Sequence, residues 1–146
     1  MIDYNKFYLV SFEVAKALKE LQYSEETLHH YIYDGNEAKP VSFGSPKKSL
    51  KIKQYETFNA PTQGYIIREL RDKYKILVLP QVAKINGEIK YSFDICDLNP
   101  ELSKDNWILF DNFNDTEIWY DNEEDATDAG ILKGLNILKE RGIVWE

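Results

Sequence analysis

Apolar residues recur at helical spacing directly after Ser11. Val14, Leu18 and Leu21 stand at i, i+4 and i+7, and charged residues occupy positions between them. This period matches one face of an α-helix. Because serine is a favoured N-cap residue, the pattern predicts a helix from Ser11 to about Gln22.

Two more segments show the same period. Residues 66–74 follow a turn at residues 59–62, whose Pro and Thr suit the start of a helix. Residues 131–138 carry another apolar stripe. Candidate N-caps at residues 121–122 precede it, together with acidic residues that suit the helix dipole. Gly142 is a typical helix stop. The chain therefore predicts three helices.

A period of two appears in the middle of the chain. Residues 75–84 are rich in β-forming residues, and residues 89–95 alternate between apolar and polar. Asn86-Gly87 lies between them and favours a tight type I′ turn, because both residues need positive φ. The pattern predicts a β-hairpin.

The two-residue turn also sets the expected register of this hairpin. It pairs Val82 with Tyr91 and Val78 with Ile95. Pro80 has no backbone N–H to donate, so we expect its strand to lie at a sheet edge or to be bulged at that point.

Weaker patterns predict the other strands. Residues 28–34, 107–113 and 117–120 have strand-forming composition and end at turn residues. Residues 35–59 contain scattered Gly, Pro and Ser, with a short alternating stretch at residues 50–53. We therefore expect a long, partly mobile loop near residues 35–59.

Composition supports a folded domain. Of the 146 residues, 43% are hydrophobic and 14% are aromatic, which is too apolar for a disordered chain. Helices and strands do not alternate as βαβ units, so we expect the α+β class. The expected architecture is an antiparallel sheet of four to six strands with three packed helices. No repeat or linker divides the chain, and residues 1–146 are expected to form a single domain.

Cys96 is the one cysteine, so no internal disulfide can form. No CxxC motif or nearby histidine accompanies it, which is typical of a buried, unreactive thiol. The N-terminus lacks the basic start and apolar run of a signal peptide. No segment approaches the roughly 20 apolar residues that span a bilayer. We expect a cytoplasmic protein without membrane contact.

The net charge of −7 is distributed unevenly. Residues 97–130 contain eleven Asp and Glu and one basic residue, Lys104, for a charge of −10. Such a segment repels phosphates, so we expect no direct nucleic-acid binding. The lysines between residues 39 and 53 are typical of a solvated loop or strand edge.

The common catalytic and metal-binding patterns are missing from the sequence. No Walker A, dinucleotide-binding, GxSxG or HExxH motif occurs. His29, His30 and Cys96 are the only His and Cys residues, and adjacent histidines in a strand point to opposite faces. The acidic loops fail the EF-hand pattern. We predict no catalytic residue, no metal site and no cofactor, although paired carboxylates leave a route to hydrolysis open.

Several motifs resemble a family of small proteins, without an assigned activity, encoded by phages and mobile elements of gut anaerobic bacteria. Residues 13–20 (EVAKALKE), 60–62 (APT), 68–74 (RELRDKY) and 123–130 carry this resemblance. That family often has WLREKY where this chain has RELRDKY, without the Trp. The resemblance implies a phage or prophage accessory role inside a bacterium and transfers no site residue.

These features favour a non-enzymatic accessory protein that binds a protein partner with a basic surface. Aromatic anchors among charged residues are typical of interface hot spots, although tryptophans also suit a core. One alternative is a small carboxylate-dependent hydrolase or ligand-binding enzyme. Another is an inhibitor that mimics nucleic-acid charge. The candidate partner-binding residues are Asp111, Asp115, Glu117, Trp119, Tyr120, Asp121, Glu123 and Glu124.

Overall fold

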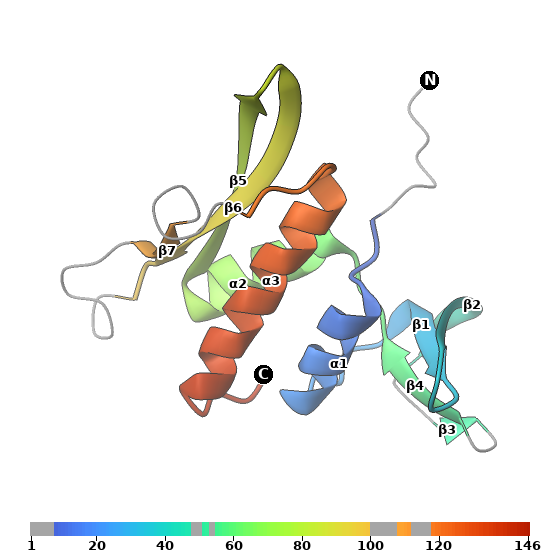
Figure 1. Cartoon of the computed structure of the whole chain (residues 1–146). Helices are drawn as coiled ribbons and strands as arrows, with labels where there is room; N and C mark the ends of the chain where they lie inside the picture. Colours follow the sequence, from blue (N-terminus) through green and yellow to red (C-terminus); the bar gives the residue numbers. More distant parts are fainter. Residues whose placement is uncertain (1–7, 48–50, 53–54, 100–107, 112–117) are drawn as a thin grey trace. The chain divides into compact units, whose positions relative to one another are not determined.

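The computed structural model describes residues 8–47, 51–52, 55–99, 108–111 and 118–146 (Figure 1). The predicted α+β class is confirmed, with three helices and antiparallel strands. The strands form two sheets, of four and three strands, where one sheet of four to six strands was expected. In chain order the elements are α1 (Phe12–Glu20), β1 (Thr27–Tyr33), β2 (Ala38–Lys47), β3 (Lys51–Ile52), β4 (Tyr55–Asn59), α2 (Gln63–Tyr74), β5 (Ile76–Ile85), β6 (Glu88–Asp97), β7 (Ile108–Asp111) and α3 (Glu123–Glu140).

Contacts within the chain gather in two compact units. Unit 1 comprises Met1–Gln63 with Leu135–Glu146, and unit 2 comprises Gly64–Gly134. Both boundaries fall within helices, in the first turn of α2 and inside α3. Domain boundaries usually fall in exposed, flexible linkers, and no such stretch separates these units. The sequence therefore gives no signal for the division into two units. That the chain forms a single domain stays a prediction.

Unit 1 contains the four-stranded sheet, in the order β2-β1-β4-β3. Strand β1 alternates its side chains between the two faces of the sheet, as predicted for the adjacent histidines. His30 is fully buried and its ring lies 4.9 Å from that of Phe43, whereas His29 is half-buried. The two imidazoles therefore do not converge on one metal ion.

Helix α1 begins as predicted and covers the aromatic face of this sheet. The Ser11 side chain accepts a hydrogen bond from the Val14 backbone N–H at 3.3 Å. The ring of Phe12 lies 5.1 Å from the rings of Tyr33 and Phe58. Such aromatic pairs stabilise a contact beyond the apolar area they bury.

The prediction of a long, partly mobile loop near residues 35–59 is wrong. Strands β2 and β4 occupy most of this range, and β3 lies within the short strand expected at residues 50–53. The prolines of β2 stand in an edge strand, where a missing N–H on the solvent side is tolerated. The Pro and Gly content that suggested a loop therefore reflects an edge position.

Unit 2 contains the three-stranded sheet β5-β6-β7. The predicted hairpin register is confirmed, with Val82 opposite Tyr91. Asn86 and Gly87 have φ values of 52° and 82°, as the type I′ turn requires. Pro80 lies in β5, an edge strand of this sheet, as expected.

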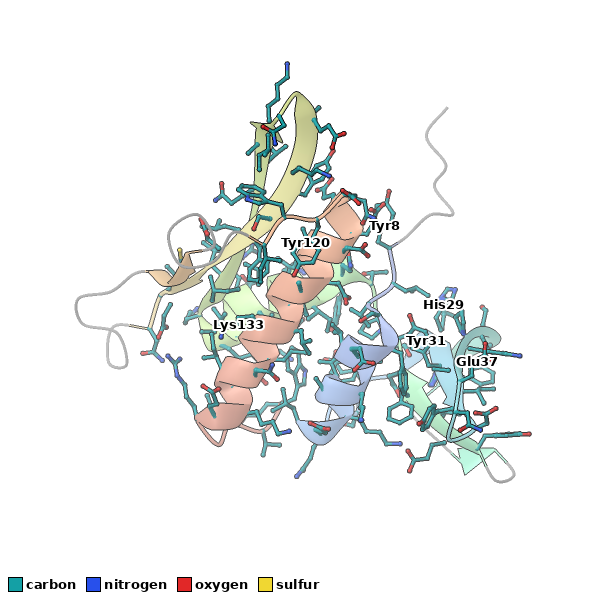
Figure 2. All side chains as sticks on the ribbon, viewed as in Figure 1. Tyr8, His29, Tyr31, Glu37, Tyr120 and Lys133 are labelled. Atoms are coloured by element: carbon teal, nitrogen blue, oxygen red, sulfur yellow. The ribbon has the colours of Figure 1, made fainter. Side chains whose placement is uncertain are left out.

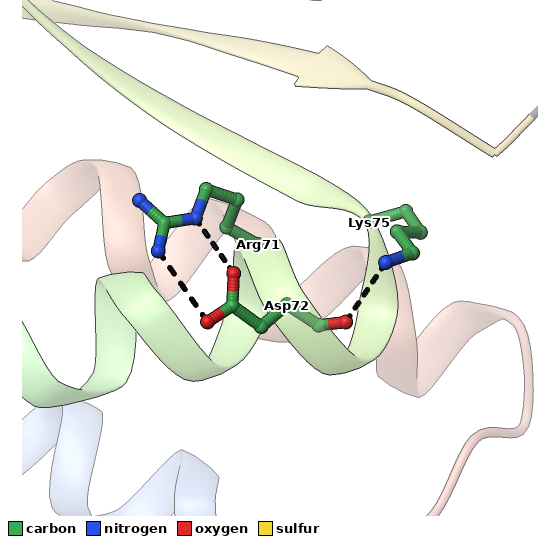
Figure 3. A network of polar contacts seen from close by, with 3 residues as sticks. All are labelled: Arg71, Asp72 and Lys75. Atoms are coloured by element: carbon green, nitrogen blue, oxygen red, sulfur yellow. Dashed lines mark hydrogen bonds and ion pairs between the residues drawn. The ribbon is translucent and has the colours of Figure 1, made fainter.

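Helix α2 ends in a network of surface contacts (Figure 3). Arg71 donates from Nε to Asp72 Oδ1 at 2.8 Å, and Lys75 Nζ donates to the Asp72 carbonyl at 3.0 Å. The hydrogen bond from Arg71 lowers the pKa of Asp72. Lys75 has a φ of 59°, outside helical geometry. The exposed Arg71–Asp72 pair contributes little to stability. Cations at this end of α2 suit the helix dipole.

Helix α3 approaches the sheet of unit 2 closely because two of its residues are glycines. A Cβ added at Gly130 would lie 2.7 Å from Val78 Cγ1 and 3.0 Å from Phe93 Cγ. A Cβ added one turn later, at Gly134, would lie 3.5 Å from Ile76 Cγ2. Any side chain at Gly130 would force the helix or its neighbours to move.

Candidate protein-binding surface

Tyr120 lies beside β6, on the edge away from β5. Its backbone N–H donates to the Tyr91 carbonyl at 2.8 Å, and the Tyr91 N–H donates to the Tyr120 carbonyl at 2.9 Å. Figure 2 shows Tyr120 next to the first turns of α3. Both tyrosines are half-buried, and so is Trp119. This short antiparallel bridge leads the chain from the sheet into α3.

Asp121, the next residue, forms an ion pair with Lys90. The Lys90 ammonium also lies 3.3 Å from Glu88 Oε2, so two carboxylates share one cation. The hydrogen bond between Lys90 and Asp121 lowers the pKa of Asp121 and raises the pKa of Lys90. Water reaches these groups and screens the pairs, so they contribute more to charge placement than to stability.

Asn122 caps α3, as one of the two predicted candidates. Its Oδ1 accepts the Asp125 backbone N–H at 2.8 Å, and its Nδ2 donates to Asp125 Oδ2 at 3.1 Å. Glu123, Glu124 and Asp125 fill the first turn, where the helix dipole favours negative charge. These acids therefore help to start α3, whatever else they do.

The phenol of Tyr120 is close to this acidic turn. Burial, and then the Asp125 carboxylate, raise the pKa of Tyr120 above its ordinary value. Both causes favour the neutral phenol over the phenolate. Tyr120, Asp121, Glu123 and Glu124 thus follow one another in the chain at the start of α3, and the Tyr120 phenol is near Asp125.

The other candidate residues are placed elsewhere or not described. Asp111 ends β7 and lies opposite Asp94. Asp94 is three residues along β6 from the bridge to Tyr120, or about 10 Å. Asp115 and Glu117 lie outside the described residues. The described part of the site is therefore centred on the start of α3.

An apolar part of this surface escaped the sequence reasoning. On the hairpin face that carries Tyr91, Val82 and Ile89 are 63% and 61% exposed. Strand length was an available signal, because β5 and β6 have ten residues each, long enough to extend past a covering helix. We name this surface the open face, and it consists of Val82, Ile89, Tyr91 and Tyr120.

A separate concavity of about 210 Å³ lies in unit 1, at the turn between β1 and β2. This volume is below the roughly 300 Å³ at which ligand pockets begin. Asp34 Oδ1 accepts the backbone N–H groups of Glu37 and Asn36, both at 2.8 Å, and these bonds lower the pKa of Asp34. The carboxylate is thus committed to the turn. The lining residues are Ile32, Asp34, Glu37, Lys39, Val41 and Tyr55.

Cys96 is buried, as predicted. Its thiol has a raised pKa because burial disfavours the thiolate and the nearby Asp94 carboxylate adds to this effect. The thiolate is the reactive form of cysteine. The surroundings of Cys96 therefore suit an unreactive core residue.

The described part of the chain holds neither a cluster of metal ligands nor a membrane-spanning helix. No three His, Cys, Asp or Glu side chains there lie together as metal ligands would. No helix within those ranges combines the length and apolar content needed to cross a bilayer. Comparison with protein families, curated proteins and solved structures found no match to this chain.

Proposed function

We propose that the chain is a non-enzymatic phage or prophage accessory protein that binds a protein partner with a basic surface. Support comes from the position of Tyr120 at the start of α3, near Asp125 and directly before Asp121, Glu123 and Glu124 in the chain. An aromatic side chain beside several carboxylates is an arrangement that suits an interface anchor. The phage or prophage setting follows from the sequence resemblance.

Residues 88–91 and 118–130 contain six acidic side chains and one basic side chain, Lys90. Lys90 is shared by two of the carboxylates, Glu88 and Asp121. The formal charge of these two segments together is −5, which sets up a negative field. Such a field steers a basic partner toward the surface and raises its association rate. We name these carboxylates the acidic rim, and they are Glu88, Asp121, Glu123, Glu124, Asp125 and Asp128.

Affinity capture from a bacterial lysate with charge-matched variants tests this proposal. Glu123→Gln with Glu124→Gln removes two charges from the rim. Glu13→Gln with Glu26→Gln removes the same charge elsewhere, including one acid in the first turn of α1. We expect a protein that the wild type and the control retain and the rim variant retains several-fold less, with weaker capture at higher salt. Equal capture of every protein by both variants would exclude the rim as the binding surface.

The two alternatives have less support among the described residues. A carboxylate enzyme needs a pair of acids in a pocket. The unit 1 concavity has two acids in its lining, Asp34 and Glu37, but Asp34 Oδ1 accepts two backbone N–H groups of the turn. A nucleic-acid mimic needs carboxylates in rows on an exposed face. Asp97 is 4% exposed and accepts the Asn99 N–H at 2.9 Å, and Asp121 is paired with Lys90. These two acids therefore do not fit such a row.

A further inference from the structure

The open face forms a continuous row across the sheet of unit 2. Val82 is paired with Tyr91, and Tyr91 is paired with Tyr120 on its other side. Directly paired residues point to the same face with their Cβ atoms about 5 Å apart. Ile89 stands two positions from Tyr91 on β6 and extends the row toward the turn. Two strongly exposed aliphatic side chains thus adjoin two half-buried aromatic rings.

The exposed residues of the open face begin where α3 no longer packs against the hairpin. Gly134 of α3 is next to Ile76, and Gly130 is next to Val78. Four helical residues (about 6 Å) therefore match two strand residues (about 6.6 Å). Glu123, the first residue of α3, is seven residues before Gly130, which corresponds to three or four strand residues beyond Val78. The helix therefore begins beside Val82. The exposure of Val82 and Ile89 is therefore a consequence of helix length rather than of a loose hairpin.

A partner meets this surface through side chains rather than by adding a strand. Pro80 interrupts the N–H groups of the edge strand β5, which disfavours pairing with another strand. A symmetric contact between two copies would bring one acidic rim against the other, and like charges across an interface are unfavourable. The rim also repels anionic lipid headgroups. These observations favour a different, basic protein as the occupant.

We propose that the open face binds an apolar segment of the partner and that Lys or Arg residues flanking this segment reach the acidic rim. The inference rests on the proposed function and adds the chemical class of the partner segment. Tyr120 joins the two parts of the surface, because it belongs to the row and is followed at once by Asp121. Lys84, which lies opposite Ile89, marks the turn end of the row. The basic flank of the partner therefore lies at the α3 end.

Titration of the ¹⁵N-labelled 146-residue chain with three synthetic peptides of equal length tests the inference. One peptide places Leu at helical spacing among Lys, one has the same Lys content with Ser in place of Leu, and one combines Leu with Glu. We expect the Leu/Lys peptide to shift the amide signals of Val82, Ile89 and Tyr91. It should bind at least about fivefold tighter than either other peptide, a difference of about 1 kcal/mol.

Two matched variants test whether a difference in peptide affinity comes from the open face. Val82→Thr with Ile89→Thr keeps the β-branched shape that suits a strand and removes apolar surface. Leu28→Thr is the control, because Leu28 is an exposed apolar residue (46%) in β1 of unit 1. The double variant should lose the preference for the Leu/Lys peptide over the Lys/Ser peptide, and the control should keep it.

The outcomes separate this inference from the function on which it rests. Equal binding of the Leu/Lys and Lys/Ser peptides without hairpin shifts would overturn the apolar segment, while rim-dependent capture from lysate could still hold. Equal binding of the Leu/Lys and Leu/Glu peptides would overturn the basic flank. A dimer detected by sedimentation and lost on Val82→Thr with Ile89→Thr would make a second copy the occupant and overturn the inference.

Discussion

The two halves of the β5–β6 hairpin share their residue types, their strands and one face of the sheet, yet their surroundings are opposite. Near the strand ends, Val78 and Ile95 are 2% and 0% exposed, whereas toward the turn Val82 and Ile89 are 63% and 61% exposed. The same alternation therefore leads to a core in one half and to open surface in the other. Alternation assigns a residue to a face, and the element above that face decides whether the residue is buried.

The exposed half has consequences beyond stability. Exposed β-branched residues beside a sheet edge can promote aggregation, and Pro80 in the edge strand counters this tendency. Apolar side chains that the chain itself leaves uncovered are common at binding surfaces. The difference between the two halves therefore separates the part of the hairpin that holds unit 2 together from the part proposed to bind.

The largest expected effect comes from shortening one isoleucine in each half. Ile95→Ala should lower the free energy of unfolding by about 2–5 kcal/mol, because it leaves a cavity in the core. Ile89→Ala should lower it by less than about 1 kcal/mol, because that side chain is already in water and only strand preference changes. Urea unfolding of both variants measures the two values. Similar losses would mean that an element covers the turn half as well.

A methyl group at the closest approach of α3 should have an intermediate effect. Gly130→Ala should destabilise the protein by about 1–3 kcal/mol, because the new Cβ would collide with Val78 and Phe93. Gly64→Ala is the control, since no atom outside its chain neighbours and its own helix backbone lies within 4 Å of its added Cβ. That change should stabilise by up to about 1 kcal/mol, because it reduces the freedom of the unfolded chain. A stable Gly130→Ala protein would show that α3 does not set the limit of the buried half.

The smallest expected effect concerns the ion pair beside the open face. The pKa of Asp121 lies below 3.8 because Lys90 donates to its carboxylate. The folded state therefore favours the charged carboxylate. Its small contribution to stability is present above about pH 3.8 and is lost as the pH falls through the lower, folded-state pKa.

A carboxyl NMR titration of Asp121 checks this direction. Lys90→Gln should raise the pKa of Asp121 toward 3.8, and high salt should do the same in the wild type. Lys133→Gln, in α3, serves as a lysine control and should leave the titration of Asp121 unchanged. An unaltered titration curve in the Lys90→Gln protein would contradict the ion pair.

Local rules predicted the elements that depend on near neighbours. The Asn86-Gly87 turn set the register of ten pairs in the hairpin, because a two-residue loop leaves no freedom to slip. Caps at Ser11 and Asn122 were predictable because each requires only a side chain and an N–H three residues later. These predictions needed no knowledge of the rest of the chain.

The candidate site was only partly predictable. The acidic residues of the first turn of α3 and Tyr120 were recognised from composition, but their meeting with β6 depends on the Tyr91–Tyr120 bridge between residues distant in sequence. The sequence did not predict the open face, because its exposure also depends on residues distant in sequence. Val82 and Ile89 carry core-like residue types, and only the end of α3 leaves them in water.

By itself, the sequence determined the α+β class, the helix starts, the hairpin register and the concentration of acidic charge, because these follow from backbone geometry and residue type over short distances. Only the tertiary structure decided that the strands form two sheets, that β2 and β4 replace a loop, and that α3 covers half of the hairpin. These features depend on contacts between residues that are distant in sequence. The burial of a side chain is set by such contacts, so a local sequence pattern cannot predict it.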